Sequence, residues 1–147
     1  MVKAPHVPGS EIWGAAGSSA ASRQGASRGG IIPVVNLESK LKRFSEQWSP
    51  KIVASYNGND VMVVKVQGEF VWHSHPDTDD FFLVLKGRLT IQLRDGDVHL
   101  GPGELYVVPR GIEHRPVAEE EVHLLLIEPA GTPNTGDHAT AAVKGFI

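Results

Sequence analysis

Residues 68–87 read GEFVWHSHPDTDDFFLVLKG, and this stretch decides the fold of the chain. His73 and His75 are two residues apart, and residues i and i+2 of a β-strand point to the same face. Both imidazoles are therefore expected to point toward one spot. After a short turn that contains Pro76, Asp80 opens the apolar run 81–85.

A second stretch, residues 103–114, reads GELYVVPRGIEH and ends on another histidine. His114 follows a Pro-x-Gly turn at residues 109–111, after the apolar run 105–108. Two histidines, a carboxylate and a third histidine, all carried by predicted strands, are a donor set that suits a divalent transition metal. The sequence therefore predicts a metal site made of His73, His75, Asp80 and His114.

These two stretches resemble the two sequence motifs of the cupin superfamily. The first motif is matched by Gly68, His73, His75, Asp80 and Gly87, and the second by Gly103, Pro109, Gly111 and His114. The similarity covers residues 60–128 and is greatest to small single-domain metal-binding cupins, the sugar-phosphate-isomerase-like group. It implies an all-β fold, a double-stranded β-helix or jelly-roll cupin barrel, with the same four residues as metal ligands.

The chain departs from the cupin pattern at two positions. Asp80 stands where the family usually has glutamate, and Ala118 stands where an asparagine is often found. Aspartate reaches roughly 1.3–1.5 Å less far than glutamate, whereas metal–oxygen bonds measure about 2.0–2.2 Å. Asp80 either coordinates directly from a strand closer to the metal or acts through a water. Strand alternation points Asp79 to the opposite face, unless a bulge exchanges the two residues.

Composition limits the possible classes of protein. The chain has 147 residues, a length typical of one domain, and its 41% hydrophobic and 21% charged content is ordinary for a globular protein. A net charge of −3 gives no electrostatic reason to expect nucleic acid. The absence of cysteine excludes disulfides and thiolate metal sites. No apolar run approaches the ~20 residues of a membrane helix, and no secretory signal is evident, so a cytoplasmic location is expected.

Three parts of the chain are predicted. Residues 1–30 are rich in Gly, Ala and Ser and are expected to form a flexible extension or leader. Residues 31–130 are expected to form the cupin barrel domain, with an N-terminal edge strand at 31–35 and one short helix after Asn36. Leu37, Leu41, Phe44 and Trp48 share one helical face, and Pro50 ends the helix, which is expected to cover one end of the barrel. Residues 131–147 form a C-terminal tail that either folds over the barrel or frays.

About nine strands are predicted from alternation and turn residues. Asn57-Gly58-Asn59-Asp60 is a hairpin signal between the strands predicted at 52–56 and 61–66. Residues 119–121 are all glutamate and are expected to mark an exposed hairpin between the strands at 112–117 and 122–127. Strands that are apolar on both faces, such as 81–85 and 124–127, favour packing against the helix or a second subunit, so a homodimer is predicted.

Other polar residues carry weaker signals. Glu69 has the same parity as His73 and His75, which makes it a candidate catalytic base, with a solvated residue at a strand end as the alternative. His99 and His123 have no partner at ligand spacing and are expected to be structural.

The predicted site indicates a metal-dependent cupin enzyme that acts on a small oxygenated molecule, such as a sugar or lactone, by Lewis-acid isomerase, lyase or hydrolase chemistry. The cofactor would be one divalent transition metal, Zn, Mn, Fe or Ni. The alternatives are an Fe(II) dioxygenase and a non-catalytic module that binds metal or a small molecule. A small-molecule substrate is the expected partner, without nucleic acid or membrane.

Overall fold

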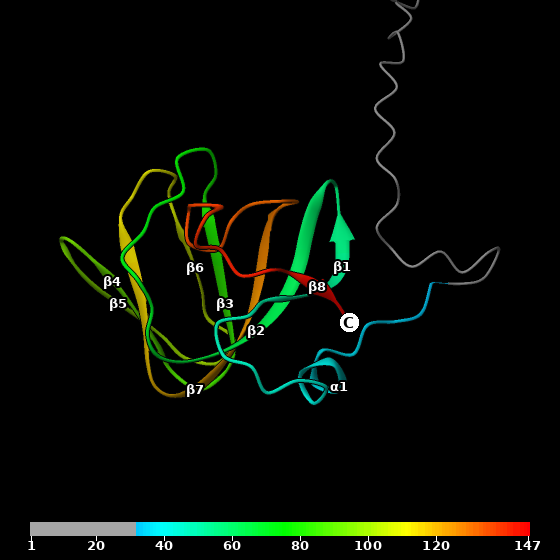
Figure 1. The fold of residues 1–147 in the computed structure, drawn as a ribbon. Helices are drawn as coiled ribbons and strands as arrows, with labels where there is room; N and C mark the ends of the chain where they lie inside the picture. The colour runs from blue at the N-terminus through cyan, green and yellow to red at the C-terminus, as the bar shows by residue number, and fades with distance from the viewer. Residues whose placement is uncertain (1–31) are drawn as a thin grey trace, which may run out of the picture.

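A computed structural model describes residues 32–147, and the predicted extension 1–30 lies outside the described residues. One helix, α1 (Leu37–Leu41), precedes eight strands (Figure 1). The strands are β1 (Lys51–Tyr56), β2 (Asn59–Glu69), β3 (Asp80–Lys86), β4 (Leu89–Leu93), β5 (Gly96–Leu100), β6 (Leu105–Val108), β7 (His114–Pro129) and β8 (Gly145–Phe146). The predicted all-β fold with one short helix is confirmed.

The β1–β2 hairpin lies where predicted, but only the first two residues of the predicted turn 57–60 connect the strands. Tyr56 pairs with Asn59 across these two residues, and Asn57 and Gly58 have φ of 47° and 77°. Positive φ at both positions is the type I′ geometry, which matches the right-handed twist of paired strands. Asn and Gly adopt this conformation with little strain. The turn residues therefore set the register of β1 against β2 next to the turn.

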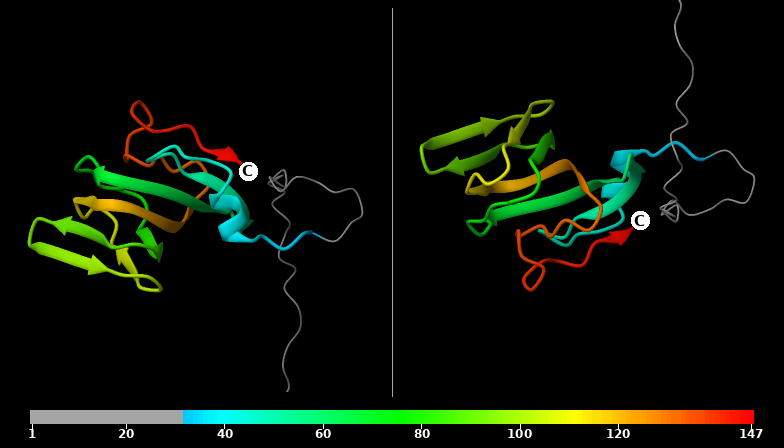
Figure 2. Two further views of the ribbon diagram at one scale, coloured as in Figure 1. Left: turned by 90° about the horizontal axis from the view of Figure 1, so that it is seen from below. Right: turned by 90° about the horizontal axis from the view of Figure 1, so that it is seen from above.

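Strand β7 is the centre of the sheet. It pairs with β2 along one edge, while β3 and β4 pair with different parts of its other edge. β3 carries β6 and β4 carries β5, so the two strand pairs extend from β7 on the same side. Figure 2 shows β7 running between β2 and these pairs. The strands wrap around one interior, which holds the larger hydrophobic cluster.

The predicted hairpin at residues 119–121 is wrong, because β7 runs through this stretch without a turn. Val66 pairs with Val122 and Gly68 with Ala118, so three glutamates on β7 lie opposite one residue of β2. This is an extended bulge, which bends a strand and leaves the extra residues unpaired. All three glutamates are exposed, so the charge run marks a bend within one strand.

Helix α1 is shorter than predicted, and it does not lie at the end of the barrel where it was expected. It ends at Leu41, which packs with Val53 and Val63 in a second hydrophobic cluster on the outer side of β1 and β2. The helix therefore covers a sheet face and does not close a barrel end. Trp48 packs against the interior cluster, so Leu41 and Trp48 cannot share one helical face.

The ends of the described chain also differ from expectation. Residues 32–36 form no strand, so the predicted edge strand is wrong over that range. The C-terminal tail folds back across the sheet, and β8 pairs parallel with β1. The Ile147 amide donates to Ile52, and Lys40 Nζ donates to the Ile147 carbonyl at 2.6 Å. No helix within residues 32–147 has the length and apolarity to cross a membrane.

Candidate metal centre

The segment that carries His73 and His75 is held against the start of β7. His73 and His114 exchange two backbone hydrogen bonds, of 3.1 and 2.9 Å. The Gly111 amide donates to the His75 carbonyl at 2.8 Å. Residues 70–79 contain only this isolated bridge and no regular strand, contrary to the prediction. Pro76, which has no N–H to donate, and the turn after it interrupt pairing, yet both imidazoles still face the interior.

Asp80 is the first residue of β3, and its side chain is buried. Its neighbour Asp79 is exposed and accepts a hydrogen bond from the Arg110 amide at 2.9 Å. The two carboxylates therefore point in opposite directions, as strand alternation requires. His114 opens β7 and is also buried.

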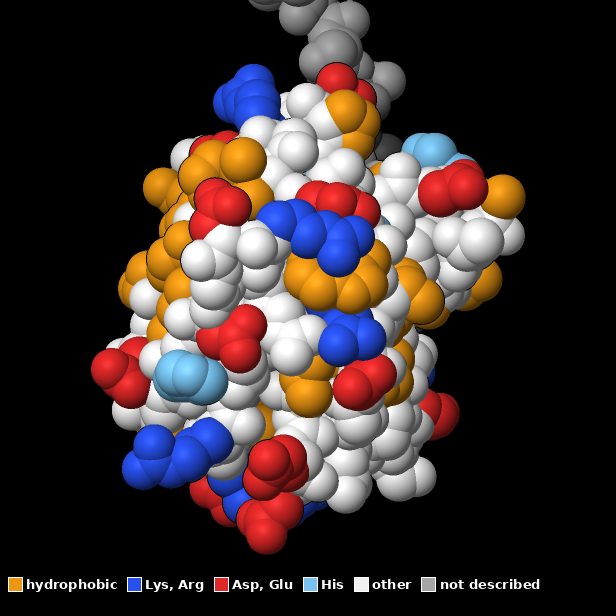
Figure 3. Space-filling model, turned by 90° about the vertical axis from the view of Figure 1, so that its left-hand side faces the viewer, with side chains coloured by type: hydrophobic (Ala, Val, Ile, Leu, Met, Phe, Trp, Pro, Cys, Tyr) orange, Lys and Arg blue, Asp and Glu red, His pale blue; other side chains and the backbone are white. Residues whose placement is uncertain are grey.

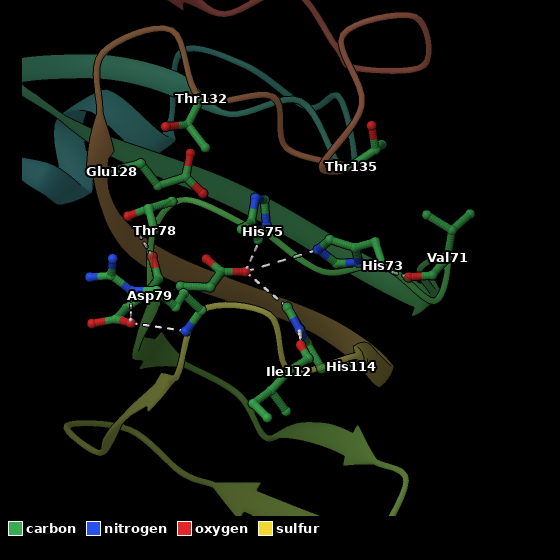
Figure 4. Close-up of polar contacts among 12 residues, drawn as sticks. Val71, His73, His75, Thr78, Asp79, Ile112, His114, Glu128, Thr132 and Thr135 are labelled. Carbon is green, nitrogen blue, oxygen red and sulfur yellow. Dashed lines mark hydrogen bonds and ion pairs between the residues drawn. The ribbon is translucent and has the colours of Figure 1, made fainter.

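The four predicted ligands converge on one point, and Figure 4 shows the three histidine rings pointing toward it. Asp80 Oδ2 lies 2.9 Å from Nε2 of His114, 3.2 Å from Nε2 of His75 and 3.9 Å from Nε2 of His73. The possible ligand atoms of the four residues lie within 4.8 Å of one another. Each residue is less than 9% exposed. Water therefore competes little for these donor atoms.

Backbone carbonyls orient two of the imidazoles. Nδ1 of His73 lies 2.9 Å from the Val71 carbonyl oxygen, and Nδ1 of His114 lies 2.9 Å from that of Ile112. A carbonyl only accepts, so Nδ1 donates in both rings, and in a neutral ring the Nε2 lone pair would face Asp80. Metal-binding histidines are typically fixed by a hydrogen bond of this kind.

The donor set fits a divalent cation. When the rings of His73 and His114 are neutral, their Nε2 lone pairs face the Asp80 carboxylate, and neither side has a hydrogen to donate. A cation between these atoms would bind the lone pairs of both. His75 Nε2 is buried without a hydrogen-bond partner, although Asp80 lies near it. Three imidazoles and one carboxylate suit Zn, Fe, Ni or Mn.

The electrostatics favour the metal-binding protonation states of His73 and Asp80, whereas the raised pKa of His75 favours its protonated form. Burial lowers the pKa of His73 to about 4. Burial is the largest single influence on the pKa of Asp80, and it raises this pKa. The contacts with His114 and His75 together outweigh burial and lower the pKa of Asp80 to about 2. Burial would also lower the pKa of His75, but contact with the Asp80 carboxylate raises it. A neutral His73 and an ionised Asp80 are ready to act as ligands.

Glu69 does not join this cluster. Its side chain is 62% exposed and pairs with Arg115 at 3.1 Å. The Arg115 and Arg94 guanidinium carbons lie 5.4 and 3.8 Å from the centre of the Trp72 ring, and Arg94 pairs with Glu113. Figure 3 shows basic and acidic side chains around hydrophobic surface on one face of the molecule. Glu69 is therefore part of a surface array of charges.

Glu128 is a buried polar residue that was not predicted as part of the site. It is 3% exposed and lines the same cavity as His73 and Asp80. Lys144 Nζ pairs with its Oε2 at 2.8 Å. Burial is the main cause that raises the pKa of Glu128, followed by the nearby Asp80 charge. The alternation of residues along β7 could have indicated Glu128. Apart from the bulge, the even-numbered positions from His114 to Glu128 face the interior. The predicted hairpin at 119–121 concealed this parity.

Comparison with known proteins identifies the family. The family model described as a cupin domain matches residues 60–128. A cupin-2 domain containing protein from Shewanella frigidimarina NCIMB 400 is 47% identical, with a TM-score of 0.65, over 65% of this chain and 94% of that protein. Protein NMB1881 from Neisseria meningitidis is 31% identical, with a TM-score of 0.61, over 67% of this chain and all of that protein.

One curated protein is also similar to this chain. The uncharacterized protein YdbB of Bacillus subtilis (strain 168) is 31% identical over 81 residues, which are 54% of this chain and 72% of the relative. This chain belongs to the cupin superfamily, and the predicted fold class is confirmed. The named relatives carry no stated activity, so function has to be argued from the site.

Proposed function

We propose that this chain is a metal-dependent cupin enzyme that acts on a small oxygenated molecule by Lewis-acid isomerase, lyase or hydrolase chemistry. The observation that supports it is the convergence of three Nε2 atoms and one carboxylate oxygen on a single buried point. The fold alone does not carry the proposal, because one fold hosts many activities.

Each residue has a defined task in this proposal. His73, His75 and His114 would hold the cation through Nε2, and Asp80 through Oδ2. A bound divalent cation would polarise a substrate oxygen or lower the pKa of a bound water. The carbonyls of Val71 and Ile112 keep two rings in the required orientation.

Reloading experiments test this function. The protein is stripped with a chelator, reloaded separately with Zn, Mn, Fe or Ni, and screened for turnover of lactones, esters and phosphorylated sugars. We expect turnover with one of these metals and loss of that turnover in His75→Ala. The control variant His99→Ala, which changes an exposed histidine on a strand, should retain turnover.

Two results would change the conclusion. Oxygen uptake that occurs only with iron would favour the dioxygenase alternative. Stoichiometric metal binding without metal-dependent turnover of any substrate would contradict the enzyme proposal and favour a non-catalytic binding module.

A further inference from the structure

A small cavity adjoins the metal ligands inside the barrel. Its volume is about 40 Å³, and His73 and Asp80 form part of its wall. On the same measure, a cavity needs about 10–15 Å³ to hold one water. The cavity therefore accepts only a few atoms, and any substrate group that enters it has to be compact.

Most of the cavity wall is apolar. Val64, Val66, Phe82, Leu124 and Leu126 line it, and all five belong to the interior hydrophobic cluster. Each is at most 8% exposed. A hydroxyl placed against this wall would lose its hydrogen bonds to water without a replacement.

Two polar residues of the wall each have a partner within the protein. Glu128 pairs with Lys144 at 2.8 Å, and Asn134 Oδ1 accepts a hydrogen bond from the Ala142 amide at 2.9 Å. His73 and Asp80 belong to the metal site. Glu128 is close enough to Asp80 for their charges to interact, and Asn134 belongs to the C-terminal tail, so these polar residues adjoin the metal ligands and the tail.

We propose that the substrate is a compact molecule that binds the cation through an oxygen atom and places an unsubstituted hydrocarbon end against Val64, Phe82 and Leu124. This inference rests on the proposed function, because it needs the cation in its site. It narrows the substrate class, since a sugar would put several hydroxyl groups against an apolar wall.

The test uses the protein reconstituted with Co²⁺, whose visible absorption reports ligands that enter its coordination shell. Propionate and 3-hydroxypropionate are titrated into it, because they differ only by a hydroxyl at the end remote from the carboxylate. We expect propionate to bind about tenfold more tightly, the scale of one buried hydroxyl without a partner. Equal affinities, or tighter binding of 3-hydroxypropionate, would overturn the inference.

A matched pair of variants tests the location of the hydrocarbon end. Val64 lines the cavity, whereas Val84 is equally buried in the same hydrophobic cluster but does not line it. Val64→Ala should raise the affinity for butyrate relative to propionate several-fold, and Val84→Ala should leave this ratio unchanged. Identical ratios in both variants would place the hydrocarbon end elsewhere and overturn the inference.

The outcomes separate the two proposals. Failure of Co²⁺ to bind would contradict the metal site itself and the proposed function with it. Co²⁺ binding without the expected preference for propionate would overturn only the substrate class.

Discussion

At the scale of single residues, Asp80 is the centre of the site because all three histidine Nε2 atoms lie within 3.9 Å of its Oδ2. The shorter reach of aspartate is compensated by the position of Asp80 at the first residue of β3, where its carboxylate is already among the imidazoles. Direct coordination is therefore the geometry that we favour over coordination through a water.

Removal of a residue that only orients a metal ligand typically weakens metal binding by about 10- to 100-fold. Since Asp80 would be a ligand itself, we predict that Asp80→Ala weakens metal binding by at least this much. Isothermal titration with Zn²⁺ measures the change. Asp79→Ala is the matched control, because this neighbouring carboxylate points to the surface. Unchanged affinity in Asp80→Ala would show that the carboxylate is not a ligand.

The four candidate ligands could be predicted from the sequence, because short-range patterns and the resemblance to the cupin motifs indicate the same residues. His73 and His75 share parity, Asp80 opens an apolar strand, and His114 follows a turn. The inward direction of Glu128 was not predicted, because the expected hairpin at 119–121 would have separated it from His114, whereas the bulge keeps the even positions inward on both sides. Glu69 illustrates the limit of parity, since the irregular segment after it removes the alternation that linked it to His73.

At the scale of elements, the C-terminal tail is the part that the sequence left open. Its turn-rich composition allowed both folding and fraying, because its contacts are with residues far away in the chain. The structure docks it beside the metal site: Asn134 lines the cavity, and Lys144 reaches Glu128 and the Thr132 carbonyl. Likewise, helical periodicity suggested a longer α1, but tertiary packing places Leu41 and Trp48 on different clusters.

We predict that Gly136→Ala destabilises the fold more than Gly131→Ala does. Both glycines have positive φ, 76° and 86°, so both substitutions carry a cost of about 1 kcal/mol. A Cβ at position 136 would also collide with the Ser74 carbonyl oxygen, whereas position 131 faces open space. Overpacking adds about 1–3 kcal/mol. Chemical denaturation of both variants measures the difference, and equal losses would contradict the docking of the tail on the segment 73–75.

We predict that Lys144→Met lowers the free energy of unfolding by about 3 kcal/mol, since it leaves the Glu128 carboxylate buried without its partner. The Glu128 and Lys144 side chains are 4% and 10% exposed. The double variant Lys144→Met/Glu128→Gln should recover most of that loss, because it also removes the buried charge. A double-mutant cycle by urea denaturation measures both steps. Additive losses would mean that the pair is not coupled.

At the scale of the whole molecule, two hydrophobic clusters on opposite sides of the sheet explain why several strands are apolar on both faces. The interior cluster adjoins the candidate metal site, since Phe82 lies edge-on to His114, and the outer cluster packs against residues of α1 and Ile147. Leu105 and Val107 on β6 are still 54% and 39% exposed. The homodimer stays a prediction, which sedimentation equilibrium would test.

The site and the fold are also linked energetically. A cation that binds only the folded chain stabilises it by RT ln(1 + [metal]/Kd), about 4 kcal/mol at a thousandfold excess over Kd. The four ligands come from the segment before β3 and from the first residues of β3 and β7, so the cation would join parts of the chain that are distant in sequence.

The most direct test of the metal site is elemental analysis by mass spectrometry of the purified protein, beside His73→Ala/His75→Ala and the control His99→Ala/His123→Ala. The control removes two histidines that lie outside the buried cluster. We predict close to one equivalent of a transition metal in the parent and in the control after metal is supplied, and almost none in the site variant. Equal metal content in all three proteins, or none in the parent after metal is supplied, would contradict the assignment of these residues as a metal centre.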